Sequence, residues 1–343
     1  MGMVRIKDIA AKAGVSPTTV SNVIHGNTKK VSKDTIEKIQ RLLEESSYVP
    51  SMSARMLAEN RSRLIGVMIG GGDFQKQEGS QRGFTDILIK SLESEIYKKN
   101  YYMLFHLSNS PEESVQIAAT WNVEGLLTIG LTAQDNYKIQ SKCKVPVVSI
   151  DTYYEAEKTA NVGLDDSQGG YEMTRFLLEH GHRDIVFLAD NDYGVDYHRW
   201  IGMKGALDRF QVAYSEKSSH IIIPRNRQER FEFYNENMEE LARRDVLFFA
   251  SDYYAAEAVM YLKDHGIKVP EDISVAGFDD SEYARMCRPE LTTIHQDMAL
   301  KGEAAVMKLF DIIEGKKEIR LNTKLPVRLV IRDSVKLRSS CIK

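Results

Sequence analysis

The sequence is poor in cysteine and has no long apolar run. Its 343 residues include three cysteines, Cys143, Cys287 and Cys341, with no second cysteine or histidine at metal-ligand spacing. We therefore expect reduced thiols, with no disulfide, no metal and no cofactor. Apolar runs such as Ile185–Ala189 are far shorter than the ~20 residues needed to cross a bilayer, so no membrane partner is expected.

The motifs of common enzyme classes are also missing. The glycine run from Gly70 to Gly72 lacks the Gly-Lys-Ser/Thr of a phosphate-binding loop. No Gly-x-Ser-x-Gly elbow occurs, and the eight histidines show no paired spacing. These absences predict a protein that is not an enzyme and has no catalytic residues. The first residues, Met-Gly-Met-Val-Arg, do not resemble a secretory signal, so we expect a cytoplasmic protein.

Charge is unevenly distributed along the chain. Residues 1–63 contain 11 Lys and Arg against 6 Asp and Glu, a net charge of +5, whereas the whole chain carries −3. The remaining residues therefore carry −8. A basic head on an acidic body predicts that only the head binds a polyanion.

The head shows the pattern of three short helices. In the first, small or apolar residues recur on one helix face: Ile6, Ile9, Ala10 and Ala13. Gly14 ends this helix, and Ser16 and Pro17 suit the cap and first position of a second helix that runs to His25. Ser32 caps a third helix. Its inner side carries Ile36, Ile39, Leu42 and Leu43.

The outward face of the second helix is polar. Thr18, Asn22 and His25 lie opposite Val20 and Val23 at about 100° per residue. Short side chains that donate and accept hydrogen bonds can contact base edges in a major groove, whereas a helix made for packing usually carries Glu and Lys outward. The pattern predicts a helix-turn-helix that reads DNA, and it also fits a small helical bundle of another purpose.

Several short runs occur together in this head. They are Ile-Lys-Asp-Ile-Ala at 6–10, Ala-Gly-Val-Ser-Pro-Thr-Thr-Val-Ser-Asn-Val at 13–23, Val-Ser at 31–32, Tyr-Val-Pro at 48–50 and Ala-Arg-Met-Leu at 54–57. In this combination the head resembles the DNA-binding domain of the lactose-repressor and galactose-repressor (LacI/GalR) family of transcriptional regulators. The resemblance implies a regulator that binds operator DNA.

The resemblance also implies roles for individual residues. Pro17, Thr18 and Asn22 match positions that face base edges. The matching positions that hold the head on phosphates are Ser16, Thr19, Ser21, His25, Ser32, Thr35 and Tyr48. Asn22 stands where some members have Arg, so a bidentate contact to guanine is replaced by a preference for adenine or by a single polar contact.

A short segment after the head matches the hinge helix of the family. Residues 51–58 are too few for a helix that is stable alone in water, so we expect this helix to fold on DNA. The resemblance implies that Leu57 is inserted at a minor-groove step and that Ala54 allows close approach. Without the resemblance, Leu57 fits equally well as a linker residue that packs on the body.

The body shows two series of apolar strands with helices between them. The first series is Leu64 to Ile69, Tyr102 to Leu107, Gly125 to Ile129 and Val145 to Ile150. The second is Ile185 to Ala189, Ile221 to Ile223, Val246 to Ala250 and Ile273 to Gly277. We therefore predict an all-α helix-turn-helix head and hinge helix, followed by an α/β, periplasmic-binding-protein-like body of two doubly wound parallel-sheet lobes.

We expect three segments along the chain. The DNA-binding domain is placed at 1–49, the hinge helix and linker at 50–63, and the effector-binding and dimerisation domain at 64–343. Within the last, lobe 1 is expected at 64–163 and 295–325, and lobe 2 at 164–294 and 326–338.

The end of the chain returns to lobe 1. A helix from Met298 to Ile313 is expected there, followed by one closing strand from Leu325 to Ile331. The chain then stops without a leucine heptad, so we expect a homodimer rather than a tetramer.

Ligands of open parallel sheets bind beyond the carboxyl ends of the strands, so we expect an effector between the lobes. The candidate effector-binding residues are Phe74, Asp151, Tyr193, Arg199, Asp252 and Asp279. Carboxylates and a guanidinium suit a polyol, and an aromatic ring can stack on a sugar, so a carbohydrate effector is expected. A lone Asp at such a place is more often a cap or surface residue.

The resemblance extends into the body. Gly-His-Arg at 181–183, Gly-Phe-Asp-Asp at 277–280 and Pro-Glu-Leu-Thr-Thr-Ile at 289–294 are similar to motifs of the same regulators. It implies that Arg199, Asp279 and Asp151 contact the effector. Gly130 and Ser251 stand where some sugar-binding members have amide side chains, so the identity of the effector is not implied.

Other functions stay open at this point. A sugar-binding protein without a gene-regulatory role would need an export signal and would have no use for residues 1–63. An enzyme fused to the head would need a reacting group in the cleft. We predict a repressor of pseudo-palindromic, double-stranded operator DNA that is controlled by a small molecule, with a regulator controlled by a protein corepressor as the alternative.

Overall fold

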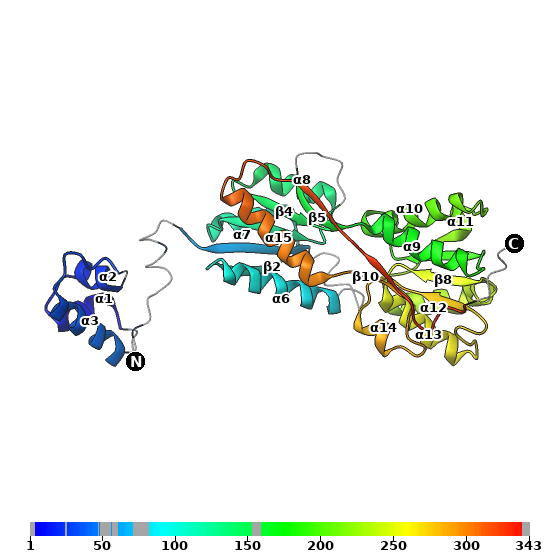
Figure 1. Cartoon of the computed structure of the whole chain (residues 1–343), viewed down its shortest axis with the longest axis horizontal. Coiled ribbons are helices and arrows are strands. Elements are labelled where there is room, and N and C mark those ends of the chain that lie inside the picture. The colour runs from blue at the N-terminus through cyan, green and yellow to red at the C-terminus, as the bar shows by residue number, and fades with distance from the viewer. Residues whose placement is uncertain are drawn as a thin grey trace. The chain divides into compact units, whose positions relative to one another are not determined.

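The structure, a computed structural model, describes residues 4–24, 26–46, 48, 56, 61–70, 82–152 and 159–337. The chain divides into two compact units, residues 1–61 and 62–343, whose elements are drawn in Figure 1. In these described ranges, no helix has the length and apolar character needed to span a bilayer.

The head is built from short helices. Within its described residues these are α1 (Ile6–Ala13), α2 (Pro17–Ile24) and α3 (Lys33–Glu45). Gly14 ends α1 in the left-handed conformation, at φ +74°, which glycine adopts without strain. Ile9, Val20 and Ile39, one from each helix, are fully buried at the centre of the core. The predicted end of the second helix, His25, lies outside the described residues.

Lobe 1 of the body is built on a parallel sheet, sheet A. In the described part of the chain its strand order is β11-β5-β4-β3-β1-β2. The strands are β1 (Leu64–Gly70), β2 (Tyr102–Ser108), β3 (Gly125–Ile129), β4 (Val147–Ile150), β5 (Ala160–Leu164) and β11 (Asn322–Leu325). In the described ranges, helices pack on both faces. One face is covered by α6 (Arg82–Lys98) and α15 (Met298–Ile313), the other by α7 (Pro111–Thr120) and α8 (Ala133–Lys142).

Lobe 2 is built on a second parallel sheet, sheet B, with the order β7-β6-β8-β9. The strands are β6 (Ile185–Ala189), β7 (His220–Ile222), β8 (Val246–Phe249) and β9 (Ser274–Ala276). One face packs against α9 (Asp166–Glu179) and α10 (Gly194–Arg209), the other against α12 (Arg227–Leu241) and α13 (Asp252–Asp264). The short helices α11 (Glu216–Ser219) and α14 (Glu282–Met286) complete the lobe. Helices on both faces explain why these strands read as continuous apolar runs.

The single closing strand predicted from Leu325 to Ile331 is wrong. Strand β11 ends at Leu325 in sheet A, and β12 (Arg328–Val330) pairs antiparallel with β10 (Thr293–His295) instead. Pro326 separates the two strands. It has no N–H to donate, so the ladder of sheet A cannot continue through it.

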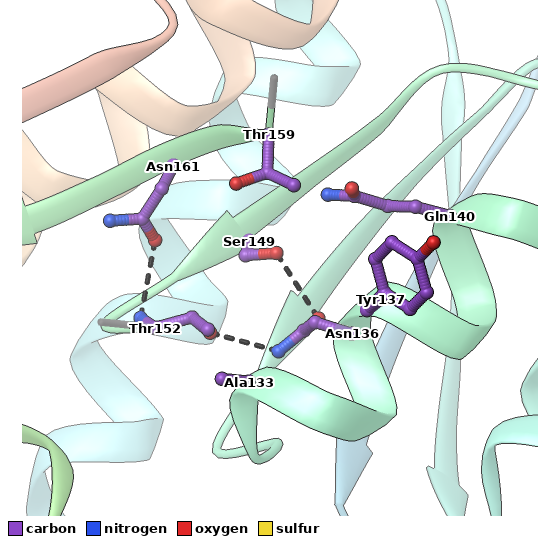
Figure 2. Close-up of a pocket in the computed structure, with 8 residues that line it drawn as sticks. All are labelled: Ala133, Asn136, Tyr137, Gln140, Ser149, Thr152, Thr159 and Asn161. Atoms are coloured by element: carbon purple, nitrogen blue, oxygen red, sulfur yellow. Dashed lines mark hydrogen bonds between the residues drawn. The ribbon is translucent and has the colours of Figure 1, made fainter. Parts of the chain in front are cut away.

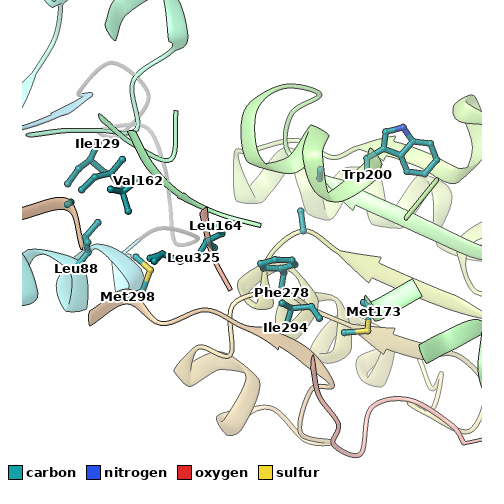
Figure 3. Close-up of a cluster of buried hydrophobic side chains, with 14 of the residues drawn as sticks. Leu88, Ile129, Val162, Leu164, Met173, Trp200, Phe278, Ile294, Met298 and Leu325 are labelled. Carbon is teal, nitrogen blue, oxygen red and sulfur yellow. The ribbon is translucent and has the colours of Figure 1, made fainter. Parts of the chain in front are cut away.

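The two lobes share one apolar core where the chain crosses between them. Leu164, Leu325 and Met298 lie at the lobe 1 ends of the crossing segments, and they belong to the same buried cluster as Phe278 and Ile294 of lobe 2 (Figure 3). Because these segments bury apolar side chains, they position the polar residues next to them.

Candidate functional site

The N-termini of α2 and α3 carry the same pair of hydroxyl residues. Oγ of Ser16 accepts a hydrogen bond from the N–H of Thr19 at 3.1 Å and lies 2.9 Å from its Oγ1. Ser32 and Thr35 repeat this arrangement at 3.3 and 2.8 Å. Helix N-termini offer N–H groups and partial positive charge, so both ends can hold phosphate oxygens.

The residues predicted to face bases lie on the accessible side of α2. Pro17 and Thr18 are exposed and Asn22 is half-buried, whereas Val20 and Val23 are buried in the core. This helix therefore presents hydroxyl and amide groups outward.

The remaining predicted DNA contacts divide into two groups. Ser21 and Tyr48 are half-buried in the head. His25, Ala54 and Leu57 lie outside the described residues, as does most of the predicted hinge helix. The structure thus describes most of the predicted DNA contacts of the head, but not the predicted insertion of Leu57 into the minor groove.

Arg199 of α10 is the centre of a polar cluster in lobe 2. Its side chain is 7% exposed, and its Nε donates to Oδ1 of Asp166 at 2.8 Å. Its Nη1 donates to the carbonyl oxygen of Ala250, which directly follows β8, at 2.5 Å. Nη1 also lies 3.6 Å from Asp196 and 3.9 Å from Asp279. One cation is thus surrounded by three carboxylates at the end of a sheet B strand.

Asp252 and Asp279 are both buried in this region. Asp279 accepts a hydrogen bond from Nε2 of Gln296 at 2.7 Å. Asp252 accepts from the Thr293 hydroxyl at 2.6 Å and from the N–H and hydroxyl of Ser281 at 2.8 and 3.1 Å. Asp252 therefore connects the start of α13 to β10 and to the start of α14 by hydrogen bonds. Its position in the sequence did not predict these structural contacts.

The carboxyl groups around Arg199 have raised pKa values. Burial raises the pKa of Asp196 to about 8, opposed by Arg199 and assisted by repulsion from Asp190. Burial likewise raises the pKa of Asp166 and of Asp279, again against the attraction of Arg199. An ionised carboxyl group accepts hydrogen bonds and a protonated one also donates, so this cluster suits ligand groups that can do both, as hydroxyls do.

Asp151 lies directly after β4 in lobe 1. Its Oδ2 accepts from Nζ of Lys301 at 2.6 Å, and its Oδ1 is buried without a hydrogen-bond partner among the described residues. Lys301, on α15, also donates to Oε1 of Gln296 at 3.0 Å and so connects Asp151 with the lobe 2 cluster. Phe74, the other predicted lobe 1 residue, lies outside the described residues.

Tyr193 lies apart from these buried groups. It precedes α10, is 53% exposed, and accepts a hydrogen bond from Nη2 of Arg225 at 2.9 Å. Nε of Arg225 lies 3.5 Å from Oδ2 of Asp190. Tyr193 is therefore a residue of an exposed rim, whereas Arg199 and Asp279 are buried.

Sequence reasoning missed several charged residues of this region. Asp166 follows β5, a strand outside the predicted series, so the sequence pattern did not point to it. Asp196 could have been found, because it lies in the first turn of a helix that follows a strand of that series. Lys301 could not, because a lysine inside an amphipathic helix is usually exposed. Only the fold brings its ammonium to Asp151.

A small polar cavity lies beside β4 and α8 in lobe 1 (Figure 2). It is lined by Ala133, Asn136, Tyr137, Gln140, Ser149, Thr152, Thr159 and Asn161. Asn136 donates to Oγ1 of Thr152 at 2.9 Å and accepts from Oγ of Ser149 at 3.1 Å. The space open to the centre of a water molecule is about 10 Å³, enough for about one water and too small for a sugar.

The two cysteines that the structure describes are not part of either site. Cys143 and Cys287 are free thiols, and Cys341 lies outside the described residues. Burial raises the pKa of Cys287 to about 11, which keeps it protonated at neutral pH. Where the structure describes side chains, no three His, Cys, Asp or Glu residues are grouped so that they could hold a metal ion.

Both parts of the chain match known protein families. Residues 5–51 match the bacterial regulatory proteins of the lacI family, and residues 174–335 match the periplasmic binding protein-like domain. The first match covers α1, α2 and α3, and the second covers most of lobe 2 and the segments that return from it.

Relatives extend these matches over nearly the whole chain. The transcriptional repressor PurR of Klebsiella pneumoniae (strain 342) is 31% identical, over 97% of each chain. The Lac repressor dimer, solved bound to operator and the anti-inducer ONPF, has a TM-score of 0.85 and 26% identity over 97% of this chain and 99% of that one. The regulator CelR, solved with cellobiose, has a TM-score of 0.72 and 25% identity over 96% and 99%. The chain therefore belongs to the lacI family of bacterial regulatory proteins and is a DNA-binding transcriptional regulator rather than an enzyme.

Proposed function

We propose that this regulator is a repressor whose operator affinity is controlled by a small polyhydroxylated molecule, a sugar or sugar derivative, bound between the two lobes. The observation that carries the proposal is the cluster of Arg199, Asp166, Asp196 and Asp279, which is connected through Lys301 to Asp151 of lobe 1. The relatives solved with ONPF and with cellobiose support a ligand of this class.

The chemistry of the cluster favours a neutral ligand rich in hydroxyl groups. Carboxylate oxygens accept hydrogen bonds from hydroxyls, and each carboxylate can engage two neighbouring hydroxyls. A phosphate or carboxylate ligand would add negative charge to a site where acidic groups already outnumber Arg199. Phe74, Asp151, Tyr193, Arg199, Asp252 and Asp279 remain the proposed effector residues.

On the DNA side, residues 1–49 form the proposed reading domain and residues 50–63 the proposed hinge and linker. Pro17, Thr18 and Asn22 are assigned to base edges of a pseudo-palindromic operator. The paired hydroxyls at the starts of α2 and α3 support the assignment of Ser16 and Ser32 to phosphates. The proposed insertion of Leu57 at a minor-groove step is based on the sequence alone. A regulator of this kind acts in the cytoplasm, where the chromosome is.

A homodimer supplies the two heads that a pseudo-palindromic operator needs. Among the described residues, exposed apolar side chains occur together on α6 and on β2, the edge strand of sheet A: Ile87, Tyr97, Tyr102, Phe105 and Leu107. An edge strand with such side chains offers both backbone and apolar surface to a second copy. We assign this face to the dimer.

The proposed mechanism is linkage between the two sites. An effector that binds one arrangement of the lobes more tightly shifts the population toward it, and the heads of the dimer then fit the operator better or worse. Couplings of this kind typically amount to about 1–3 kcal/mol.

Thermal unfolding of the full chain against neutral sugars and their phosphate esters tests the ligand class. A ligand at 100 times its Kd stabilises the folded state by about 2.7 kcal/mol. We expect a neutral sugar to raise the melting temperature and to change operator affinity in a gel-shift titration. A response to a partner protein and to none of the sugars would contradict the proposal.

Arg199→Ala should abolish this response while folded protein still binds operator. The variant leaves Asp166, Asp196 and Asp279 without their cation and removes donors that a ligand would use. Arg227→Ala is the matched control, because Arg227 lies in the same lobe with its side chain 57% exposed. A normal ligand response in Arg199→Ala would rule out the assigned site.

A further inference from the structure

We propose that Lys301 is a positioning residue of the effector site and the point at which the carboxylates of the two lobes are joined. The inference rests on the proposed function, since it concerns the same site, but its central contact can be tested without a ligand. Lys301 lies in the first turns of α15, near the crossing from β10 into lobe 1.

The surroundings of Lys301 are unusual for a lysine. Its side chain is 1% exposed, and its Nζ donates to Oδ2 of Asp151 at 2.6 Å and to Oε1 of Gln296 at 3.0 Å. A buried ammonium is costly unless it is paired and hydrogen-bonded. Lys301 therefore pairs with the Asp151 carboxylate and holds it in this orientation.

The connection continues into lobe 2 through Gln296. The amide of Gln296 accepts from Lys301 and donates through Nε2 to Oδ1 of Asp279 at 2.7 Å. The same Oδ1 lies 3.9 Å from Nη1 of Arg199. An unbroken series of polar contacts thus runs from the end of β4, through α15, to α10.

This arrangement also specifies the group that a ligand presents to lobe 1. Oδ2 of Asp151 is occupied by Lys301, whereas Oδ1 has no partner among the described residues. An ionised carboxylate oxygen accepts and does not donate. The ligand group at Asp151 is therefore a hydroxyl or an N–H and not a phosphate.

The chain offers a matched control on the same helix. Lys308, also on α15, is buried with 7% of its surface exposed, and its Nζ contacts the carbonyl oxygen of Arg320. Lys308→Met thus removes a buried lysine of α15 that does not contact Asp151 or Gln296. The test variant Lys301→Met is compared with this Lys308→Met control. A third variant, Lys301→Arg, retains the positive charge at position 301.

The first experiment is a double-mutant cycle across the lobes that needs no ligand. Urea unfolding of Lys301→Met, Asp279→Asn and the double variant is followed by the fluorescence of Trp121 and Trp200, which both lie in the body. We expect the effect of the double variant on the unfolding equilibrium constant to differ about tenfold from the product of the two single effects. This coupling is expected even though Lys301 and Asp279 are connected only through Gln296. In the control cycle, the effects of Lys308→Met and Asp279→Asn on the unfolding equilibrium constant should multiply to within about twofold.

Should Lys301→Met fail to fold, Lys301→Gln replaces it in the same cycle. If the effects of the Lys301 and Asp279 substitutions simply multiply, as those of the Lys308 control cycle should, the proposal is overturned.

The second experiment measures ligand affinity, with ribose, cellobiose and glucose 6-phosphate as probes. For a neutral sugar that the wild type binds, we expect at least tenfold weaker binding in Lys301→Met, partial rescue in Lys301→Arg and no change in Lys308→Met. Unchanged affinity in Lys301→Met overturns the positioning role. If no probe binds the wild type, the proposed ligand class fails, and the cycle alone decides whether Lys301 joins the lobes.

Discussion

At the scale of single residues, one guanidinium dominates the electrostatics of the candidate effector site. Arg199 contacts Asp166 directly and lies within 4 Å of Asp196 and Asp279. It cannot neutralise all three, which is why burial still raises the pKa of Asp196 to about 8. Protons and hydroxyl donors therefore compete for the same oxygens, so ligand affinity and protonation are linked at this site.

Asp196→Asn should reduce the pH dependence of the stability of the body. The folded-state pKa of about 8 exceeds the ordinary value of 3.8, so the folded protein holds an extra proton between these values. Stability is therefore lost as the pH rises from about 4 to about 8. Asn cannot release that proton, so the variant should lose less stability over this range.

Urea unfolding at pH 5 and pH 8, followed by tryptophan fluorescence, measures the difference. Asp192→Asn is the control, because Asp192 is exposed in the loop that precedes α10, and it should behave like the wild type. An Asp196→Asn variant with the full loss of stability would show that this carboxyl group does not titrate as described.

Asn22→Arg should change the base preference of the head. Asn pairs in a bidentate manner with adenine, whereas Arg pairs with guanine O6 and N7, and each such pair contributes about 1–3 kcal/mol of discrimination. Selection of binding sites from a random DNA pool should give an adenine-to-guanine change at one position of each half-site. The other positions serve as the control. An identical selected site would mean that Asn22 does not contact a base.

At the scale of elements, the packing of α9 on α10 explains how Arg199 reaches Asp166. The two helices touch through glycines: a Cβ on Gly170 would lie 2.0 Å from the carbonyl oxygen of Arg199, and one on Gly202 would lie 1.9 Å from that of Ser167. No side chain fits at either position. The close backbone approach places the first turn of α9 beside the Arg199 side chain.

Gly202→Ala and Gly205→Ala should have opposite effects, although both lie in α10. Alanine favours a helix over glycine by about 0.8–1.0 kcal/mol, and a Cβ on Gly205 would meet only Tyr171, at 3.8 Å. Gly205→Ala should therefore stabilise the body. Gly202→Ala should destabilise it by about 1–3 kcal/mol through overpacking.

Urea midpoints of the two variants, with tryptophan fluorescence as the signal, give the comparison. Equal stabilisation by both substitutions would mean that the helices can separate at Gly202 without cost.

At the scale of the whole molecule, the crossing segments make the two lobes one compact unit, separate from the head. Their apolar side chains join the core of sheet A to that of sheet B, and the contacts of Lys301 and Gln296 lie beside them. A ligand that changes the position of one lobe therefore acts on both the apolar core and the polar contacts of these segments. Packed interfaces of this kind prefer discrete arrangements over continuous deformation.

Ile87→Glu should convert the proposed dimer to monomers. Ile87 is 52% exposed on α6, and a carboxylate placed on each copy of a self-complementary face would be buried against the other. Sedimentation velocity should show the change in mass, and operator affinity should fall about a hundredfold or more, because two heads no longer bind together. Trp121→Glu is the control, since Trp121 is similarly exposed, at 54%, at the end of α7. A dimeric Ile87→Glu variant would place the interface elsewhere.

The amino-acid sequence alone determined the local elements and the family. Ser16, Pro17 and Ser32 identified the starts of α2 and α3, Gly14 identified the turn, and continuous apolar runs identified the four strands of sheet B and strands β1 to β4 of sheet A. These features depend on the backbone and on near neighbours, so short patterns carry them. Asp279 could be selected for the same reason, since it occurs in a short motif after β9, and Arg199 could be selected because it matches a position of the family.

Tertiary structure alone decided which of these residues meet. Asp252 is occupied by Ser281 and Thr293, Pro326 divides the expected closing strand, and Lys301 reaches Asp151 across 150 residues of sequence. Each of these outcomes depends on contacts between distant parts of the chain and on burial, which changes the free energy of a charge far more than its neighbours in sequence do. The sequence therefore identified a DNA-binding regulator, and the fold decided how its buried charges are paired.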